Sequence, residues 1–125
     1  MTTSARAIAA SNTPRDPNDR DRLREEWRLA AHKAAAAKDN ADRLKDGKKV
    51  LFTEMKLRLM EEGLKATAAE DAVLVSAQYK GYLRKMHDAM REANDLEIES
   101  DHADRVYWDN NNREANARAE MRMTK

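Results

Sequence analysis

LREEWRLAAHKAAAAKDNADRLKDGKKVLFTEM, residues Leu23 to Met55, carries the strongest structural signal in the chain. Apolar residues recur along it in alternating steps of four and three, a spacing typical of a helix that lies along another helix. Among the positions that these steps reach, only Lys48 is polar. Its alkyl stem can lie along an apolar seam while its ammonium group reaches water. The seam positions are Leu23, Trp27, Ala30, Ala34, Ala37, Ala41, Leu44, Lys48, Leu51 and Met55.

A second seam with the same spacing begins at Tyr82 and predicts the partner helix. It is clean as far as Tyr107 and decays afterwards. The run Asp109-Asn-Asn-Asn112 is poor helix material, so helix 2 either breaks or frays there or continues to about residue 121. The positions on this seam are Tyr82, Met86, Ala89, Ala93, Leu96, Ser100, Ala103, Tyr107, Asn110, Glu114, Ala117 and Met121.

Composition agrees with an all-α class. The chain has 125 residues, 41% of them apolar and 38% charged, with three glycines and two prolines to make turns. This length is one domain at most. Because cysteine is absent, disulfides and thiolate metal sites are excluded. No apolar run approaches the roughly 20 residues that span a bilayer, and no signal peptide is evident, so we expect a soluble, cytoplasmic protein without a membrane partner.

The predicted layout is a disordered tail at 1–15 and a single helical-hairpin domain at 16–125. Within the domain we expect helix 1 at about 19–62, a turn and short helix at 63–76, and helix 2 at about 77–121. Gly63 is placed to end helix 1 in the left-handed conformation. Thr67 and Glu70 match a capping box that would start the short helix.

Folding about the 63–76 connection gives an antiparallel, coiled-coil-like hairpin on the order of 65 Å long. It places Trp27 beside Tyr107 and Trp108. Gly47, inside helix 1, is either a tolerated flaw or a point of close approach by a neighbour.

Many seam residues are alanines that bury little area, so a lone hairpin would be marginal against the entropy of ordering it. We therefore expect homo-oligomerisation into a bundle or ring through apolar residues off the seam. These spare residues are Val50, Leu57, Leu59, Met60, Val73, Leu74 and Tyr79.

Charge is segregated although the formal net charge is only +1. Residues 43–58 and 79–91 are basic and would lie side by side near the tip of the hairpin, whereas residues 92–104 carry six acidic residues and no Lys or Arg. Basic side chains interleaved with aromatic rings are what non-specific binding of single-stranded nucleic acid requires. The predicted binding residues are Lys45, Lys48, Lys49, Lys56, Arg58, Tyr79, Lys80, Arg84 and Lys85. The alternatives are a solvated helix face with core aromatics, or an acidic protein partner.

Glu99-Ser-Asp-His102 is a Glu-x-x-His step of the kind that holds di-iron centres in helical bundles. No second such step exists, and Glu99 and His102 fall off the predicted seam, so we expect an exposed acidic belt and no metal or cofactor. Because phosphate loops and nucleophile motifs are also missing, we expect that the chain is not an enzyme.

The stretch from Tyr107 to Met121 resembles the ending of a group of small helical bacteriophage proteins. The stretches from Glu61 to Asp71 and from Ser76 to Tyr79 resemble the middle of the same proteins. The resemblance covers roughly residues 20–122 and implies a gene neighbourhood of phage DNA replication and recombination. The layout is also similar to UvsY-type recombination mediators, which oligomerise, bind single-stranded DNA and help to load a recombinase.

The resulting hypothesis is an oligomeric phage accessory protein, in the cytoplasm of the infected bacterial host. It would bind single-stranded DNA, or a phage or host recombination or single-strand-binding protein, near the hairpin tip. The alternative is a protein-interaction module without nucleic-acid binding, such as a phage inhibitor of a host factor or an assembly scaffold.

Overall fold

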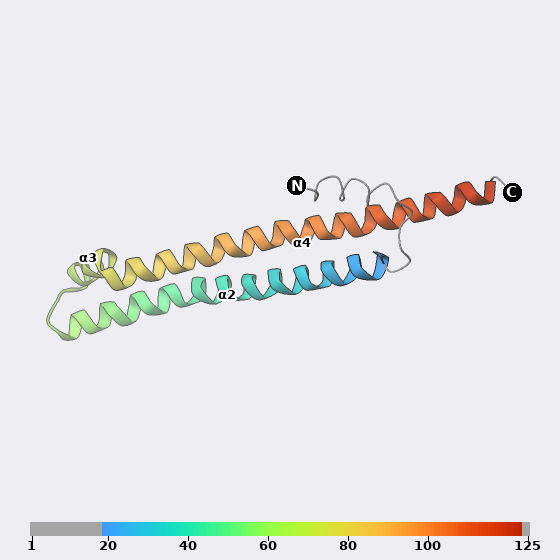
Figure 1. Cartoon of the computed structure of the whole chain (residues 1–125). Coiled ribbons are helices and arrows are strands. Elements are labelled where there is room, and N and C mark those ends of the chain that lie inside the picture. Colours follow the sequence, from blue (N-terminus) through green and yellow to red (C-terminus); the bar gives the residue numbers. More distant parts are fainter. Residues whose placement is uncertain (1–18, 124–125) are drawn as a thin grey trace, which may run out of the picture.

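The computed structural model describes residues 19–123, which form three α-helices. Helix α2 covers Asp19–Glu61, α3 covers Ala66–Val75, and α4 covers Ala77–Met123. α2 and α4 lie side by side in opposite directions, with the short α3 at the turning end of the chain (Figure 1). α3 contacts α2 more extensively than α4. The predicted all-α class is confirmed. The expected tail at 1–15 lies outside the described residues.

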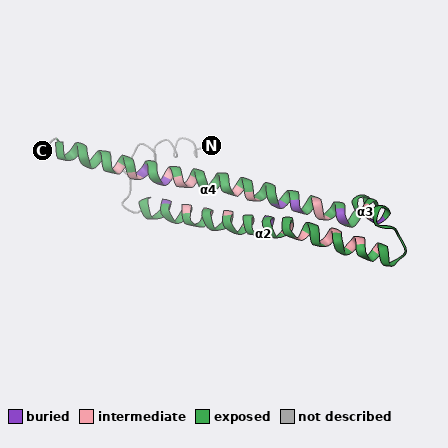
Figure 2. Ribbon diagram, turned by 180° about the vertical axis from the view of Figure 1, so that it is seen from behind, coloured by how far each residue is buried: buried purple, intermediate pink, exposed green. Residues whose placement is uncertain are grey.

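The seam predicted on α2 is the side of this helix that is covered. Every predicted position except Lys48 is buried or half-buried, and Leu23 and Ala41 are the most enclosed. Lys48 is exposed, whereas the neighbouring Gly47 is half-buried and lies on the covered side of the helix. Most of the remaining surface of both long helices is open to solvent (Figure 2). The core is therefore a single stripe of residues between the two helices. The many alanines of the seams agree with such a thin core.

The α4 seam also lies where the spacing predicts, from Tyr82 to Glu114. Its buried members are Met86, Ala89, Tyr107 and Asn110, and Asn110 is the most enclosed of them. Beyond Glu114 the pattern ends, with Ala117 and Met121 exposed. This part of α4 extends past the beginning of α2 (Figure 1), so α2 does not cover it.

Of the two alternatives left open at residues 109–112, the structure has the continuous helix, because α4 runs through them to Met123. Asn110 lies on the seam and only 1% of it is exposed. A residue held on the covered side by its neighbours stays helical even where its intrinsic preference is poor, since tertiary context overrides propensity. Seam position, and not the composition of the run, decides between the two alternatives.

The turn after α2 uses Gly63 as expected. Gly63 has a φ of 106°, and its N–H donates to the Met60 carbonyl at 3.0 Å. The Leu64 N–H donates to the Leu59 carbonyl at 3.1 Å. Together these bonds form a Schellman motif, which satisfies carbonyls at the end of the helix.

The capping box predicted at Thr67 and Glu70 is wrong. α3 begins at Ala66 after Lys65, and no side chain caps it. Glu70 instead accepts a 2.7 Å hydrogen bond from Lys56 Nζ on α2. The carboxylate thus forms a tertiary ion pair in place of a local bond to the backbone.

Ser76 separates α3 from α4 and starts the second long helix. Its backbone is extended, with φ −68° and ψ 144°, so it interrupts the helical path. Its hydroxyl donates to the Val73 carbonyl at 2.7 Å and accepts from the Tyr79 N–H at 3.1 Å. The second bond is a side-chain N-cap of α4.

At Gly47 the Tyr82 side chain of α4 lies directly against the α2 backbone. The Tyr82 hydroxyl donates to the Leu44 carbonyl at 2.5 Å. A methyl group on Gly47 would place its carbon 2.5 Å from the same hydroxyl oxygen. Of the two interpretations of this glycine, the structure supports close approach by a neighbour.

A contact between aromatic rings of α2 and α4 lies near each end of the helix pair. At the open end, Trp27 stacks on Tyr107 with 5.4 Å between ring centroids, and Tyr107 meets Trp108 edge-on at 5.3 Å, as predicted. At the turning end, Phe52 meets Tyr79 edge-on at 5.7 Å.

Two residues assigned to oligomer contacts belong to the core instead. Tyr79 is only 4% exposed and Val73 is fully buried. Tyr79 lies three residues before Tyr82, so it continues the α4 seam backwards. Val73 is enclosed because α3 packs on the long helices at this end.

Replacing Gly47 by alanine should lower the free energy of unfolding by about 1 kcal/mol. Loss of the Tyr82 hydrogen bond and displacement of its ring together cost about 2 kcal/mol, which outweighs the gain of about 1 kcal/mol in helix propensity. The matched control is Gly81→Ala on α4, where no atom lies within 4 Å of the added carbon, and it should be stabilising by about 1 kcal/mol.

Denaturant unfolding of both variants, repeated in a Tyr82→Phe background, measures this effect. With the hydroxyl removed, Gly47→Ala should become neutral or stabilising. If Gly47→Ala and Gly81→Ala stabilise equally in the unaltered chain, the close approach does not exist.

Candidate functional site

Three of the predicted binding residues gather in one place. Lys45, Lys48 and Lys49 line a recess of about 330 Å³ beside Phe52 and Tyr79. All three lysines are exposed. Within the described residues, none of the three lies within ion-pair distance of a carboxylate. Their positive charges are therefore accessible to an anion.

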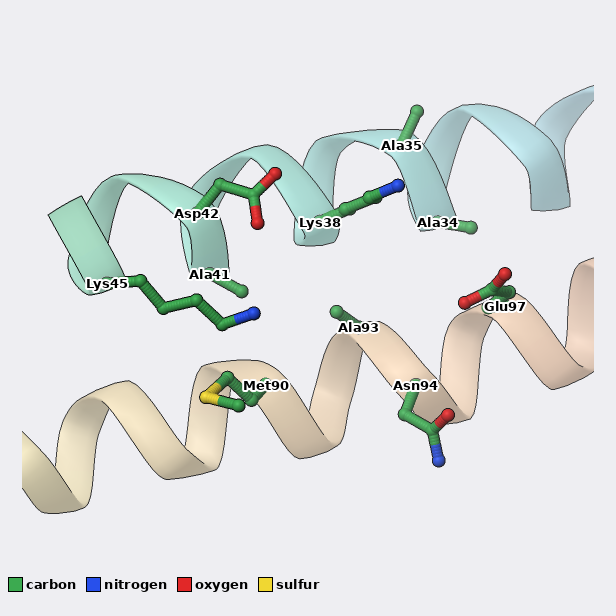
Figure 3. A pocket seen from close by; sticks show the side chains of 10 residues that line it. All are labelled: Ala34, Ala35, Lys38, Ala41, Asp42, Lys45, Met90, Ala93, Asn94 and Glu97. Atoms are coloured by element: carbon green, nitrogen blue, oxygen red, sulfur yellow. The ribbon is translucent and has the colours of Figure 1, made fainter.

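A second recess of about 320 Å³ adjoins the first and shares Lys45 with it. Its floor is made of small side chains, including Ala41 and Ala93, which point toward one another while Lys45 extends between the two helices (Figure 3). The whole set that lines this recess is Ala34, Ala35, Lys38, Ala41, Asp42, Lys45, Met90, Ala93, Asn94 and Glu97. We call the two adjoining recesses together the Lys45 groove.

Lys38 is the one basic residue lining this groove that was not among the predicted binding residues. It precedes Lys45 by seven residues, and side chains seven apart on a helix lie on nearly the same side. This spacing was the available signal, but Lys38 stands outside the basic stretch 43–58. With Lys38 included, the groove holds four lysines against Asp42 and Glu97.

The basic residues at 79–91 do not join this groove. Arg84 and Lys85 line a separate recess of about 390 Å³, which we call the Arg84 groove. The acidic residues Asp88 and Glu92 line it as well, so its charges are balanced. The single patch expected from residues 43–58 and 79–91 is therefore divided between two grooves. Side chains that are close in sequence lie on different sides of a helix, so a charged stretch does not form one surface.

Two predicted binding residues are unsuited to an external ligand. The Lys56 ammonium is paired with Glu70, and its side chain is 26% exposed. Tyr79 packs edge-on against Phe52 and is 4% exposed, so it has no ring face on which a base could stack. The stacking role predicted for Tyr79 is therefore wrong. Arg58 and Lys80 are exposed and line neither groove.

The open end of the helix pair contains a tyrosine with a shifted pKa. Hydrogen bonds from Asn111 and then Arg20 lower the pKa of Tyr107 by stabilising its phenolate. The same ring stacks on Trp27, so Tyr107 is part of the packing between α2 and α4. On the surface nearby, a hydrogen bond from Arg28 lowers the pKa of Glu25.

Glu99 and His102, the Glu-x-x-His step, are both exposed. Among residues 19–123, no group of three or more His, Asp or Glu side chains is arranged to hold a metal ion. Over the same range, none of the helices combines the length and apolar character needed to cross a membrane.

Comparison of the chain with protein-family models, with curated proteins and with solved structures found no match. The resemblance to phage recombination proteins therefore stays a prediction, and the groove geometry carries the functional argument.

Proposed function

We propose that this chain is a non-enzymatic binding protein whose Lys45 groove holds single-stranded DNA. The observation that supports this function best is the gathering of Lys45, Lys48 and Lys49 without carboxylate partners among the described residues. Binding of phosphates to an unpaired lysine cluster of this kind is favourable, because counterions condensed on the nucleic acid are released.

The shape of the groove suits a linear polyanion. It follows α2 from Ala34 to Phe52, a distance of about 27 Å at a rise of about 1.5 Å per residue. Lysines recur along this length at positions 38, 45, 48 and 49. Since Tyr79 offers no stacking surface, the contacts would be to phosphate, and binding would depend little on base sequence.

The biological role that accompanies this proposal is that of a phage accessory protein of DNA recombination or replication. It rests on the resemblance of the sequence and on the groove chemistry together. In this role the chain is a coiled-coil-like hairpin that self-associates in the host cytoplasm. It would act as a mediator between single-stranded DNA and a recombination or single-strand-binding protein.

A second candidate ligand for the same groove is an acidic amphipathic helix of a protein partner. The observation that favours it is the apolar floor, where Ala34, Ala41 and Ala93 lie beside the 36% exposed Met90. Small side chains allow a third helix to approach closely, and the lysines would pair with its carboxylates. This is the protein-interaction module without nucleic-acid binding.

Binding of a labelled single-stranded oligonucleotide should weaken linearly with the logarithm of salt concentration. Four lysines, at about −0.7 per phosphate, give a slope of about −3. The double variant Lys45→Glu/Lys49→Glu should bind at least about tenfold more weakly at about 50 mM salt, while circular dichroism shows unchanged helicity.

The matched control reverses two charges in the other groove, Arg84→Glu/Lys85→Glu. It should change affinity much less, because those residues already lie among carboxylates. Equal losses in the two double variants would show that net charge, and not the Lys45 groove, determines binding.

Met90→Gln distinguishes the two ligands. A polar residue on the floor should weaken binding of a synthetic peptide helix with leucines on one face and glutamates on the other, since that peptide needs apolar contact. The same variant should leave oligonucleotide binding within about twofold, because phosphate contacts come from the lysines. If the unaltered chain binds the peptide but not the oligonucleotide at about 50 mM salt, the protein-interaction role replaces the nucleic-acid role.

A further inference from the structure

A row of exposed residues follows one side of α2, opposite the side that carries Lys38 and Lys45. Three large apolar members are open to solvent: Leu29 is 48% exposed, Val50 57% and Leu57 53%. Ala36 is also exposed and belongs to the same row. Successive positions in the row are seven residues apart, a spacing that keeps side chains on one side of a helix.

The order of residues in this row is nearly symmetric. It runs Leu29, Ala36, Arg43, Val50 and Leu57, so an aliphatic residue stands at equal distances on either side of Arg43. A two-fold interface requires a surface that is complementary to itself. When two copies of α2 are placed antiparallel about Arg43, Leu29 meets Leu57 of the second copy and Ala36 meets Val50.

Charges along the row also agree with this pairing. Arg43 forms a 3.1 Å ion pair with Asp39, one turn earlier, and Asp46 stands one turn later. Each arginine at the centre is therefore paired with one carboxylate of its own helix and has a second one turn away, which reduces the repulsion between the two Arg43 side chains.

Beside the row, Lys33 and Glu54 lie at almost equal distances from Arg43. The antiparallel pairing brings each lysine near the glutamate of the other copy, and the two-fold axis produces this contact twice. Opposite charges in these places fix the register of the two helices.

We propose that a second copy of this chain covers the row, with the two α2 helices antiparallel and the two-fold axis at Arg43. The shared row extends over four heptads, about 42 Å at the helical rise. Because Lys38 and Lys45 lie on the opposite side of α2 from the row, both Lys45 grooves stay open in the dimer. The proposal is independent of which anion the grooves bind.

Cysteine cross-linking tests the axis directly, since the natural chain has no cysteine. Only a residue on a two-fold axis meets its own counterpart, so Arg43→Cys should form a disulfide-linked dimer rapidly under mild oxidation. Leu29→Cys should not cross-link alone, yet it should do so when mixed with Leu57→Cys. Lys45→Cys, in the groove, is the control for random collision.

Sedimentation of the full chain provides the second measurement. The unaltered protein should have twice the mass of one chain at high concentration, and the double variant Val50→Lys/Leu57→Lys should have the mass of one chain with unchanged helicity. Ile98→Lys is the matched control, because Ile98 is 59% exposed on α4 and lies outside the row. That variant should stay dimeric.

The outcomes separate clearly. A dimer that the row variants dissociate, with Arg43→Cys cross-linking much faster than Lys45→Cys, supports the proposal. A monomer at every concentration overturns it. A dimer in which Leu29→Cys cross-links alone as fast as Arg43→Cys overturns the antiparallel axis, because self-contact along the whole row requires parallel helices.

Discussion

The close approach of α2 and α4 is the constraint on which the other features depend. Alanines along both seams let the helices come near each other, and at Gly47 the approach leaves no room for a side-chain carbon beside the Tyr82 hydroxyl. The bond from that hydroxyl to the Leu44 carbonyl joins the two helices at one defined position. The aromatic contacts of Trp27 with Tyr107 and of Phe52 with Tyr79 then follow at the two ends.

A seam of small residues has consequences for the surface. Two helices in contact cover only one side of each other, so residues beside the seam remain available for binding. On one side Lys38, Lys45 and their neighbours border an alanine floor, which gives a groove with positive charge and a shallow base. On the other side of α2 stands the row centred on Arg43. A thin core and two open surfaces fit a protein that works by binding, and the proposed dimer would add the buried area that one helix pair lacks.

The sequence predicted the elements well wherever periodicity dominates. The α4 seam follows the four-three spacing as far as Glu114, and Gly63 ends α2 as its conformational freedom suggests. Local rules failed where a tertiary contact competes with them. Glu70 pairs with Lys56 instead of capping α3, and burial of Asn110 keeps α4 helical through a run of asparagines. The candidate site was only partly predictable, since counting charge by stretches joined Arg84 to Lys45, whereas helical periodicity separates them and adds Lys38.

The register of α2 against α4 is tested most directly by a pair of cysteines placed on the two seams. Ala41 and Ala93 line the same groove, so Ala41→Cys/Ala93→Cys should close rapidly into an intramolecular disulfide. Moving the second cysteine to Ser100, about 10 Å further along α4, should abolish this closure. If the Ala41 and Ser100 pair closes as fast as the Ala41 and Ala93 pair, the two helices slide freely or adopt another register. The Lys45 groove would then not exist as a defined site.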